Sequence, residues 1–293
     1  MTLTPWNPED KEIPNMTNIY SFALGFSSLG KAQISAALFP FIMDSVPVPG
    51  ISCLISSRSA GDMKIADTEE PNPCRQGLFD ALGLDYGRVS FLEQIHSRRV
   101  LAAESRNLRC FARADGLVTG DPNIILSVTV ADCLPVFLYD TGSRGFGLLH
   151  SGWKGTGIVL DALQKMKESR GTKPGAVAAV LGPCIQSCCY RVDEERAVSF
   201  EKEFGGSGNF AADDLGDAKG NTLPGPVTLT RDNGYYLDLQ AANIRLLVNA
   251  GVRNIAVCRD CTFTDTRLGS FRREGPGYTR MMALCGNIDI PNG

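Results

Sequence analysis

Two short apolar runs in the middle of the chain, residues 124–130 and 145–149, limit what it can fold into. The first reads Ile-Ile-Leu-Ser-Val-Thr-Val after the turn signal Gly-Asp-Pro-Asn, and the second reads Gly-Phe-Gly-Leu-Leu. Such short runs, bounded by turn residues, predict largely buried strands. Residues 136–139 predict a third strand between them. Cys133 and His150 then lie where buried strands end, a place where side chains can converge on a cleft.

The rest of the chain alternates helix and strand signals. Helical spacing of apolar residues, with capping residues at the ends, predicts helices over residues 74–82, 156–169, 193–204 and 240–249. Short apolar runs predict strands over residues 51–56, 89–95, 177–181 and 255–258. This alternation is typical of an α/β (α+β) class, here one domain with mixed β-sheets flanked by helices.

Two segments depart from this pattern. Residues 1–49 carry prolines at positions 5, 8, 14, 40, 47 and 49, so we expect a loose, partly irregular N-terminal segment that ends in a strand. The main domain then covers residues 50–293. Residues 205–221 are rich in glycine and polar side chains, which predicts a surface insertion to which the sequence assigns no role.

The charge balance argues against nucleic-acid and membrane partners. The 293 residues carry a net charge of −3, and no run of lysine or arginine forms a basic patch. The apolar piece at residues 34–43 is too short to span a bilayer, and no signal sequence precedes it. Ten cysteines without an export signal predict a reducing cytoplasm. We therefore expect a cytoplasmic protein with small-molecule partners, whose oligomeric state the sequence leaves unknown.

The chain has only two histidines, His96 and His150, and both follow predicted strands, as Cys133 does. Two imidazoles and a thiolate form a ligand set that zinc accepts, and the fourth tetrahedral position is left for water in a catalytic site. In a second interpretation, Cys133 is a nucleophile that one of the histidines activates. Asp132 points to the opposite side of the chain from Cys133, which favours a supporting role.

Three cations could form an anion site. Lys154 precedes the helix predicted from residue 156, and helix N-termini bind anions through free backbone amides. Arg272 and Arg273 could complete the site, because guanidinium groups bind phosphate in a bidentate manner. An interpretation of these three residues as ordinary, solvated surface charges fits the sequence equally well.

The remaining thiols give weaker signals. Cys258 and Cys261 have CxxC spacing, but no second pair accompanies them at the spacing of a zinc ribbon. Cys184, Cys188 and Cys189 lie in one loop, and core packing is the default interpretation for them.

A series of short motifs, taken in order, resembles the laccase-domain family, first named multicopper polyphenol oxidoreductases. The resemblance runs from about residue 50 to residue 285. The motifs are Gln94-Ile95-His96, Ala114–Thr119, Thr129–Val136, His150–Gly155, Gly182-Pro183 with Cys188–Tyr190, Leu237–Leu239 with Ala241–Asn243, Cys261-Thr262 and Ser270–Arg273.

The resemblance implies an α/β fold with layered mixed sheets, and a zinc ion held by His96, Cys133 and His150. It implies phosphorolysis of adenosine, inosine or methylthioadenosine, with phosphate as co-substrate, and deamination of adenosine. Gln94, Lys154, Arg272 and Arg273 are then expected to contact substrate. The chain departs from the family at a few wall positions, which bear on substrate preference and leave the ligand set intact; they are Ser97, Gly116, Ser151, Leu268-Gly269, Phe271 and Thr279–Met281.

Three alternatives stay open at this point. Some relatives are linked to hydrolysis that edits peptidoglycan dipeptide precursors. The older assignment is copper-dependent oxidation of polyphenols, but a four-copper laccase within this chain is excluded, because its trinuclear cluster needs histidines beyond the two present. A single copper in the zinc site remains compatible with the residues. The third alternative is a nucleoside- or metal-binding module without turnover.

Overall fold

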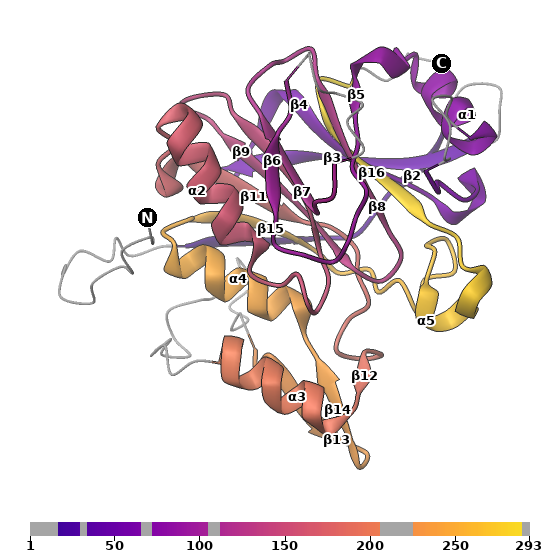
Figure 1. The fold of residues 1–293 in the computed structure, drawn as a ribbon, viewed down its shortest axis with the longest axis vertical. Helices are drawn as coiled ribbons and strands as arrows, with labels where there is room; N and C mark the ends of the chain where they lie inside the picture. Colours follow the sequence, from indigo (N-terminus) through magenta and orange to yellow (C-terminus); the bar gives the residue numbers. More distant parts are fainter. Residues whose placement is uncertain (1–16, 30–33, 66–71, 105–111, 206–224, 289–293) are drawn as a thin grey trace.

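Two large β-sheets pack face to face and carry helices on their outer sides (Figure 1). The structure, a computed structural model, describes residues 17–29, 34–65, 72–104, 112–205 and 225–288. The layered α/β architecture expected from the sequence is therefore confirmed. The predicted insertion at residues 205–221 lies, beyond Gly205, outside the described residues, as does Cys110.

The larger sheet is mixed and has seven strands. Its order is β1-β15-β11-β9-β10-β7-β6. The strands are β1 (Asn18–Phe22), β15 (Asn254–Cys258), β11 (Val177–Leu181), β9 (Leu134–Asp140), β10 (Phe146–Ser151), β7 (Gly116–Thr119) and β6 (Val100–Ala102). The central strands are buried along their whole length, which explains why the sequence shows them as continuous apolar runs.

The second sheet has six strands in the order β2-β3-β4-β16-β8-β5. The strands are β2 (Phe26–Leu29), β3 (Ile34–Met43), β4 (Val46–Ser56), β16 (Met281–Gly286), β8 (Ile125–Val130) and β5 (Val89–Ser90). β16 pairs with β4 on one side and with β8 on the other. A strand near the end of the described chain therefore completes the centre of this sheet.

Alternating side chains divide the core into layers. In β9, Phe137 and Tyr139 pack into the cluster between the two sheets, while Val136 and Leu138 pack toward the helices. This period-two division is what a strand covered on both faces requires.

Helices cover the outer face of each sheet. α2 (Ile158–Arg170) and α4 (Leu239–Asn249) pack on the seven-stranded sheet, and α1 (Pro73–Leu82) packs on the six-stranded sheet. The Asp238 side chain accepts the Ala241 backbone N–H at 2.8 Å and so caps α4, while a left-handed Gly83 ends α1.

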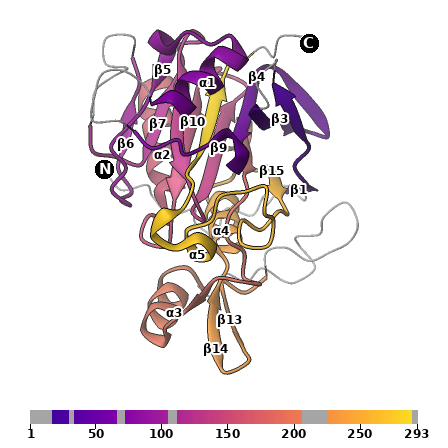
Figure 2. The same ribbon diagram turned by 90° about the vertical axis from the view of Figure 1, so that its right-hand side faces the viewer.

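A small module projects from one end of the layered body (Figure 2). It contains the three-stranded sheet β12-β14-β13 and helix α3, which a π-helical turn extends to Gly205. The elements are β12 (Arg191–Val192), β14 (Gly234–Leu237), β13 (Thr228–Arg231) and α3 (Glu194–Phe200). The short helix α5 (Phe271–Glu274) lies between the module and the body (Figure 2).

Two sequence expectations need correction. The strand predicted over residues 89–95 is only two residues long, because Glu93 forms an isolated bridge and the chain then turns toward His96. The described part of the segment expected to be partly irregular contains β1, β2 and β3. Pro40 lies at an irregularity in the pairing of β3 with β4 and is exposed there, which is how a sheet accommodates proline.

The helices within the described residues include none with the length and apolar character that a membrane crossing requires.

Candidate active site

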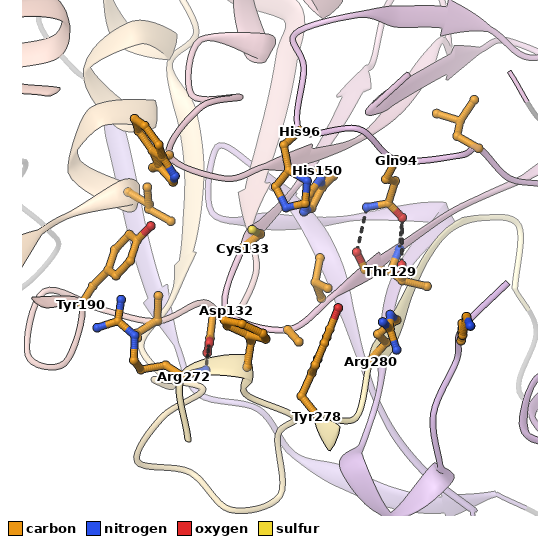
Figure 3. A pocket seen from close by; sticks show the side chains of 18 of the residues that line it. Gln94, His96, Thr129, Asp132, Cys133, His150, Tyr190, Arg272, Tyr278 and Arg280 are labelled. Atoms are coloured by element: carbon orange, nitrogen blue, oxygen red, sulfur yellow. Dashed lines mark hydrogen bonds between the residues drawn. The ribbon is translucent and has the colours of Figure 1, made fainter. Parts of the chain in front are cut away.

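Three separate segments bring His96, Cys133 and His150 together (Figure 3). Cys133 lies in the turn between β8 and β9, His150 near the end of β10, and His96 in the loop that follows β5. Their ligating atoms lie within 4.8 Å of one another, and the two imidazole rings meet at 78° with their centroids 4.8 Å apart. The convergence predicted from the strand ends is therefore present.

Asp115, directly before β7, organises two of these three residues. Its carboxylate accepts backbone N–H groups of His96 at 2.9 Å and Ser97 at 2.6 Å, and the Ser97 hydroxyl at 2.8 Å. It also contacts Nδ1 of His150 at 2.9 Å. A carboxylate on Nδ1 fixes the orientation of the imidazole and leaves Nε2 for a ligand. The side chain of Asp115 is fully buried, so this network is shielded from solvent.

Both loops around the site have unusual backbone angles. His96 has φ 57° and Asp132 has φ 86°, a left-handed region that residues other than glycine rarely adopt. Asp115 holds the first loop, as described. The second is held by the Asp132 carboxylate, which accepts the Thr262 hydroxyl at 2.6 Å and the Arg272 backbone N–H at 2.7 Å. The supporting role predicted for Asp132 is therefore confirmed.

Without a metal, the cluster pairs a Cys133 thiolate with a His150 imidazolium. Burial alone would raise the pKa of the Cys133 thiol, but the charge and hydrogen bonds of His150 and His96 outweigh burial and lower this pKa to about 6. Burial acts in the opposite direction on His150, whose pKa rises to about 10 beside Cys133 and Asp115. Cys133 is thus held as the thiolate, the form in which cysteine binds metals.

Two nitrogens and one sulfur could hold a zinc ion or a single copper ion here. Typical bond lengths of about 2.3 Å to sulfur and about 2.0 Å to nitrogen require donor separations below about 4 Å. The donor atoms here all lie within 4.8 Å of one another. The backbone at Gly152 lies so close to the Cys133 sulfur that a Cβ added to Gly152 would be only 2.8 Å from it. A residue without a side chain therefore leaves the space around the sulfur free. Three protein ligands leave a coordination position open toward solvent, which is typical of catalytic sites.

A cavity of about 900 Å³ opens above the cluster. This volume lies within the range of small-molecule sites. Cations and aromatic rings share its walls, and Figure 3 shows Arg272 and Tyr190 on one side of the Cys133 thiol and Tyr278 and Arg280 on the other. The other lining residues of these kinds are Lys64, Trp153, Arg196 and Phe271.

The structure separates the residues predicted to contact substrate into two groups. Gln94 and Arg272 line the cavity. The Gln94 amide is paired with Thr129, accepting its backbone N–H at 2.7 Å and donating to its carbonyl at 2.9 Å. Arg272 donates from Nη1 to the Arg191 carbonyl at 2.7 Å.

Lys154 and Arg273 lie away from the cavity lining. Lys154 is exposed, with its ammonium 5.5 Å from the centre of the Trp153 ring, because the turn before α2 directs it outward. The Arg273 guanidinium faces the protein and donates to the carbonyls of Thr262 at 2.6 Å and Phe263 at 3.0 Å. It therefore supports the loop that follows β15.

Sequence reasoning missed Asp115 and most of the cavity wall. Asp115 stands in a recognised motif, but its role depends on a loop and a strand 18 and 35 positions away. Tyr278, Arg196 and Lys64 lie far apart in sequence, so no local pattern relates them.

Comparisons with known proteins agree with this fold. A family model described as multi-copper polyphenol oxidoreductase laccase matches residues 57–287. A purine nucleoside phosphorylase of Corynebacterium glutamicum is 31% identical over 75% of this chain and 83% of its own length. The purine nucleoside phosphorylase YlmD of Bacillus subtilis is 30% identical over 72% and 75%.

Solved structures share the architecture. The YfiH protein of Bacillus licheniformis superposes with a TM-score of 0.67 at 27% identity, covering 80% of this chain and 92% of its own. The YlmD protein of Geobacillus stearothermophilus has a TM-score of 0.69 at 23% identity, covering 86% and 97%. With its fold, its ordered motifs and the match over most of its length, the chain belongs to the multi-copper polyphenol oxidoreductase laccase family.

Proposed function

We propose that this protein is a zinc-dependent purine nucleoside phosphorylase. The observation that supports this proposal most is the position of the His96, Cys133 and His150 cluster at the floor of a cavity whose walls combine arginines with aromatic rings. Relatives at about 30% identity are named purine nucleoside phosphorylases, which supports the same activity.

The cavity walls suit the two substrates of such a reaction. A purine is planar and apolar on its faces, so it would stack against aromatic side chains such as Tyr190 and Tyr278. Phosphate carries negative charge and would be attracted by the guanidinium groups of Arg272 and Arg280. Arg280 is already paired with Asp62 at 2.9 Å, which leaves Arg272 as the stronger candidate for phosphate.

Phosphorolysis exchanges one bond at the anomeric carbon of the ribose for another. A phosphate oxygen forms the new C–O bond as the C–N bond to the base breaks, and the base leaves with the electron pair and takes up a proton. Arg272 would hold the nucleophilic phosphate, and the cavity would hold the nucleoside beside it, so that binding converts a reaction between two free molecules into one between neighbours.

His96, Cys133 and His150 would hold the zinc ion, with Asp115 orienting His150. When bound, zinc would supply a Lewis acid that polarises a substrate oxygen or a water molecule. Cys133, with its pKa lowered to about 6, already offers a thiolate, whereas His150, with its pKa raised to about 10, would release a proton as the metal binds.

Incubation of zinc-loaded protein with inosine or adenosine, with and without phosphate, tests the proposal. We expect free base and ribose 1-phosphate only when phosphate is present, in amounts that rise together. Methylthioadenosine is expected to react in the same way. A metal-loaded, folded protein that releases no base from any of these nucleosides would sink the proposal.

The same incubation tests adenosine deamination, the second activity that we propose for this site. The open coordination position of a three-ligand site favours it, because such sites activate water. We expect inosine and ammonia from adenosine in the absence of phosphate, while a reaction mixture that yields neither product would exclude this activity.

A further inference from the structure

A second group of ligating atoms lies outside the cavity, in the thiols of Cys188, Cys189 and Cys261. The sulfurs of Cys188 and Cys189 are 3.4 Å apart, and all three sulfurs lie within 4.8 Å of one another. Cys188 and Cys189 belong to the turn before β12, and Cys261 follows β15. Two loops distant in sequence therefore present three thiols to one point.

Cys261 is the buried member, and the surrounding backbone is arranged for a thiolate. The Gln186 backbone N–H donates to its sulfur at 3.4 Å. Burial raises its pKa, but hydrogen bonds from the backbone of Gln186, Thr264 and Phe263 outweigh burial and lower it. Backbone N–H groups directed at one sulfur favour the charged form, since a neutral thiol is only a weak acceptor.

Access from solvent is available at the other side of the group. Cys188 is exposed and Cys189 is half-buried. The Arg231 guanidinium lies close by, donating to the Ser187 carbonyl at 2.7 Å and also to the Cys188 carbonyl. A cation beside three sulfurs offsets the negative charge that they would carry with a bound metal.

We propose that Cys188, Cys189 and Cys261 form a second metal site, which takes a thiophilic d10 cation, either Zn²⁺ or Cu⁺. Sulfurs around such an ion at about 2.3 Å are separated by about 3.8 Å. One pair of sulfurs is 3.4 Å apart and all three lie within 4.8 Å, so small side-chain rotations complete the site. Soft thiolates select these ions over Mg²⁺ or Ca²⁺.

The neighbouring cysteines do not compete for the same role. The Cys258 thiol, the other half of the CxxC motif, faces the Asp260 carboxylate at 3.4 Å.

Two thiols of the proposed site are protonated before a metal binds. Burial raises the pKa of Cys188 to about 12, and it raises the pKa of Cys189 as well. Cation binding must therefore displace a proton from each of these two thiols into solvent, while the lowered pKa of Cys261 makes its proton easier to displace.

A bound ion would connect the two loops that border the active-site turn. Ile185, on the first loop, donates its N–H to the Asp132 carbonyl at 2.9 Å, and Thr262, on the second, bonds the Asp132 carboxylate.

The test uses Co²⁺ as an optical probe with reduced, metal-free, full-length protein. A Cys133→Ser variant removes the thiolate of the first site, so any sulfur-to-cobalt absorbance that remains comes from another thiolate. We expect this absorbance to be about three times that contributed by Cys133 alone, since each thiolate adds to it. Additional Cys261→Ser or Cys188→Ser substitutions should weaken cobalt binding at least about ten-fold, whereas Cys74→Ser, a half-buried thiol elsewhere, should not.

Displacement of cobalt by Zn²⁺ or by Cu⁺ then identifies the preferred ion. Circular dichroism shows whether each variant is folded. If the Cys261→Ser protein does not fold, the Cys188→Ser protein still tests the proposal, because Cys188 lies in an exposed turn. A folded, reduced Cys133→Ser protein without sulfur-to-cobalt absorbance would overturn the proposal. So would absorbance that persists unchanged in the Cys188→Ser and Cys261→Ser proteins.

Discussion

The floor and the rim of the cavity are built in opposite ways. The floor consists of His96, Cys133 and His150 with Asp115, and Asp115 ties it together through hydrogen bonds to side chains and backbone. The rim consists of Tyr190, Arg272, Tyr278 and Arg280, which are exposed or half-buried and meet mainly through ring contacts. Arg272 lies 5.5 Å from the Tyr190 ring centre, and Arg280 lies 4.3 Å from that of Tyr278.

This difference indicates that the floor serves metal binding and the rim serves substrate binding. A floor held by a buried carboxylate keeps its geometry whether or not substrate is present, as a reactive centre requires. An exposed rim can adjust to the substrate that it binds. Changes in the floor should therefore reduce metal content and kcat, and changes in the rim should act on KM.

The largest effect is expected for Cys133→Ser. Serine is a poor zinc ligand and removes the thiolate, so metal content should fall from about one ion in this site toward zero and activity by at least about 10³-fold. Elemental analysis beside kinetics measures both when Cys133→Ser is compared with its parent in a Cys261→Ser background, which removes a ligand of the second group of thiols. A variant that keeps the full metal content of that parent but loses activity would instead make Cys133 a nucleophile rather than a metal ligand.

Glu274 anchors the rim, and its removal tests whether the rim depends on a largely buried charge. Its carboxylate accepts the backbone N–H groups of Ser270 and Thr279, each at 3.0 Å, on either side of Arg272. Burial opposes ionisation, but these bonds, with Arg273 and Arg58, outweigh it and lower the pKa of Glu274 to about 2.

A lowered carboxylate pKa contributes stability above the unfolded pKa, and this stability is lost as pH falls toward 2. The free energy of unfolding of wild type should exceed that of Glu274→Gln by about 3 kcal/mol at pH 6, and this difference should shrink by about 2 kcal/mol at pH 3. Urea denaturation at both pH values measures it. A difference that does not change with pH would show that the charge of Glu274 is not what holds the rim.

Asp115→Asn probes the support of the floor. The amide keeps the shape but loses the charge beside Nδ1 of His150, so zinc affinity or kcat should fall about 10- to 100-fold while the KM for phosphate stays the same. Metal competition with a chelator and steady-state kinetics measure these quantities. A change in the KM for phosphate alone would place Asp115 with the rim.

The smallest of these effects is expected at Arg272. Arg272→Ala should raise the KM for phosphate about ten-fold with little change in kcat, and Arg272→Lys should recover part of the loss. Lys154→Ala is the matched control, because Lys154 is a nearby exposed cation outside the cavity lining. Equal effects of Arg272→Ala and Lys154→Ala would mean that general charge, rather than the rim, attracts phosphate.

The buried strands and three floor residues, His96, Cys133 and His150, could be predicted from the sequence, because the strand signals are local and each of these residues follows a predicted strand. The role of Asp115 in the floor could not. β8, β9, β10, β11 and β15 appear where apolar runs predict them, within a few residues at each end. The N-terminal strands could not be predicted, because proline is read as a strand breaker unless its exposed position in the sheet is known.

The rim could be predicted only in part, because adjacent residues have opposite surroundings there. Arg272 faces the cavity while Arg273 donates to backbone carbonyls, although the sequence presents the two as equivalent. The direction of the Lys154 side chain could not be predicted either, because closeness to His150 in sequence does not determine it. Such directions follow from tertiary packing.

The position of β16 between β4 and β8 has a consequence for the order of folding. The Met282 N–H bonds the Ser56 hydroxyl across 226 positions of sequence, and β8 joins β4 only through this strand. Contacts between residues so far apart in sequence form late and slow folding. During synthesis, β8 can pair only with the two-residue strand β5 until residues 281–286 have left the ribosome. The turn that carries Cys133 follows β8 directly, so we expect metal uptake to follow the synthesis and pairing of β16.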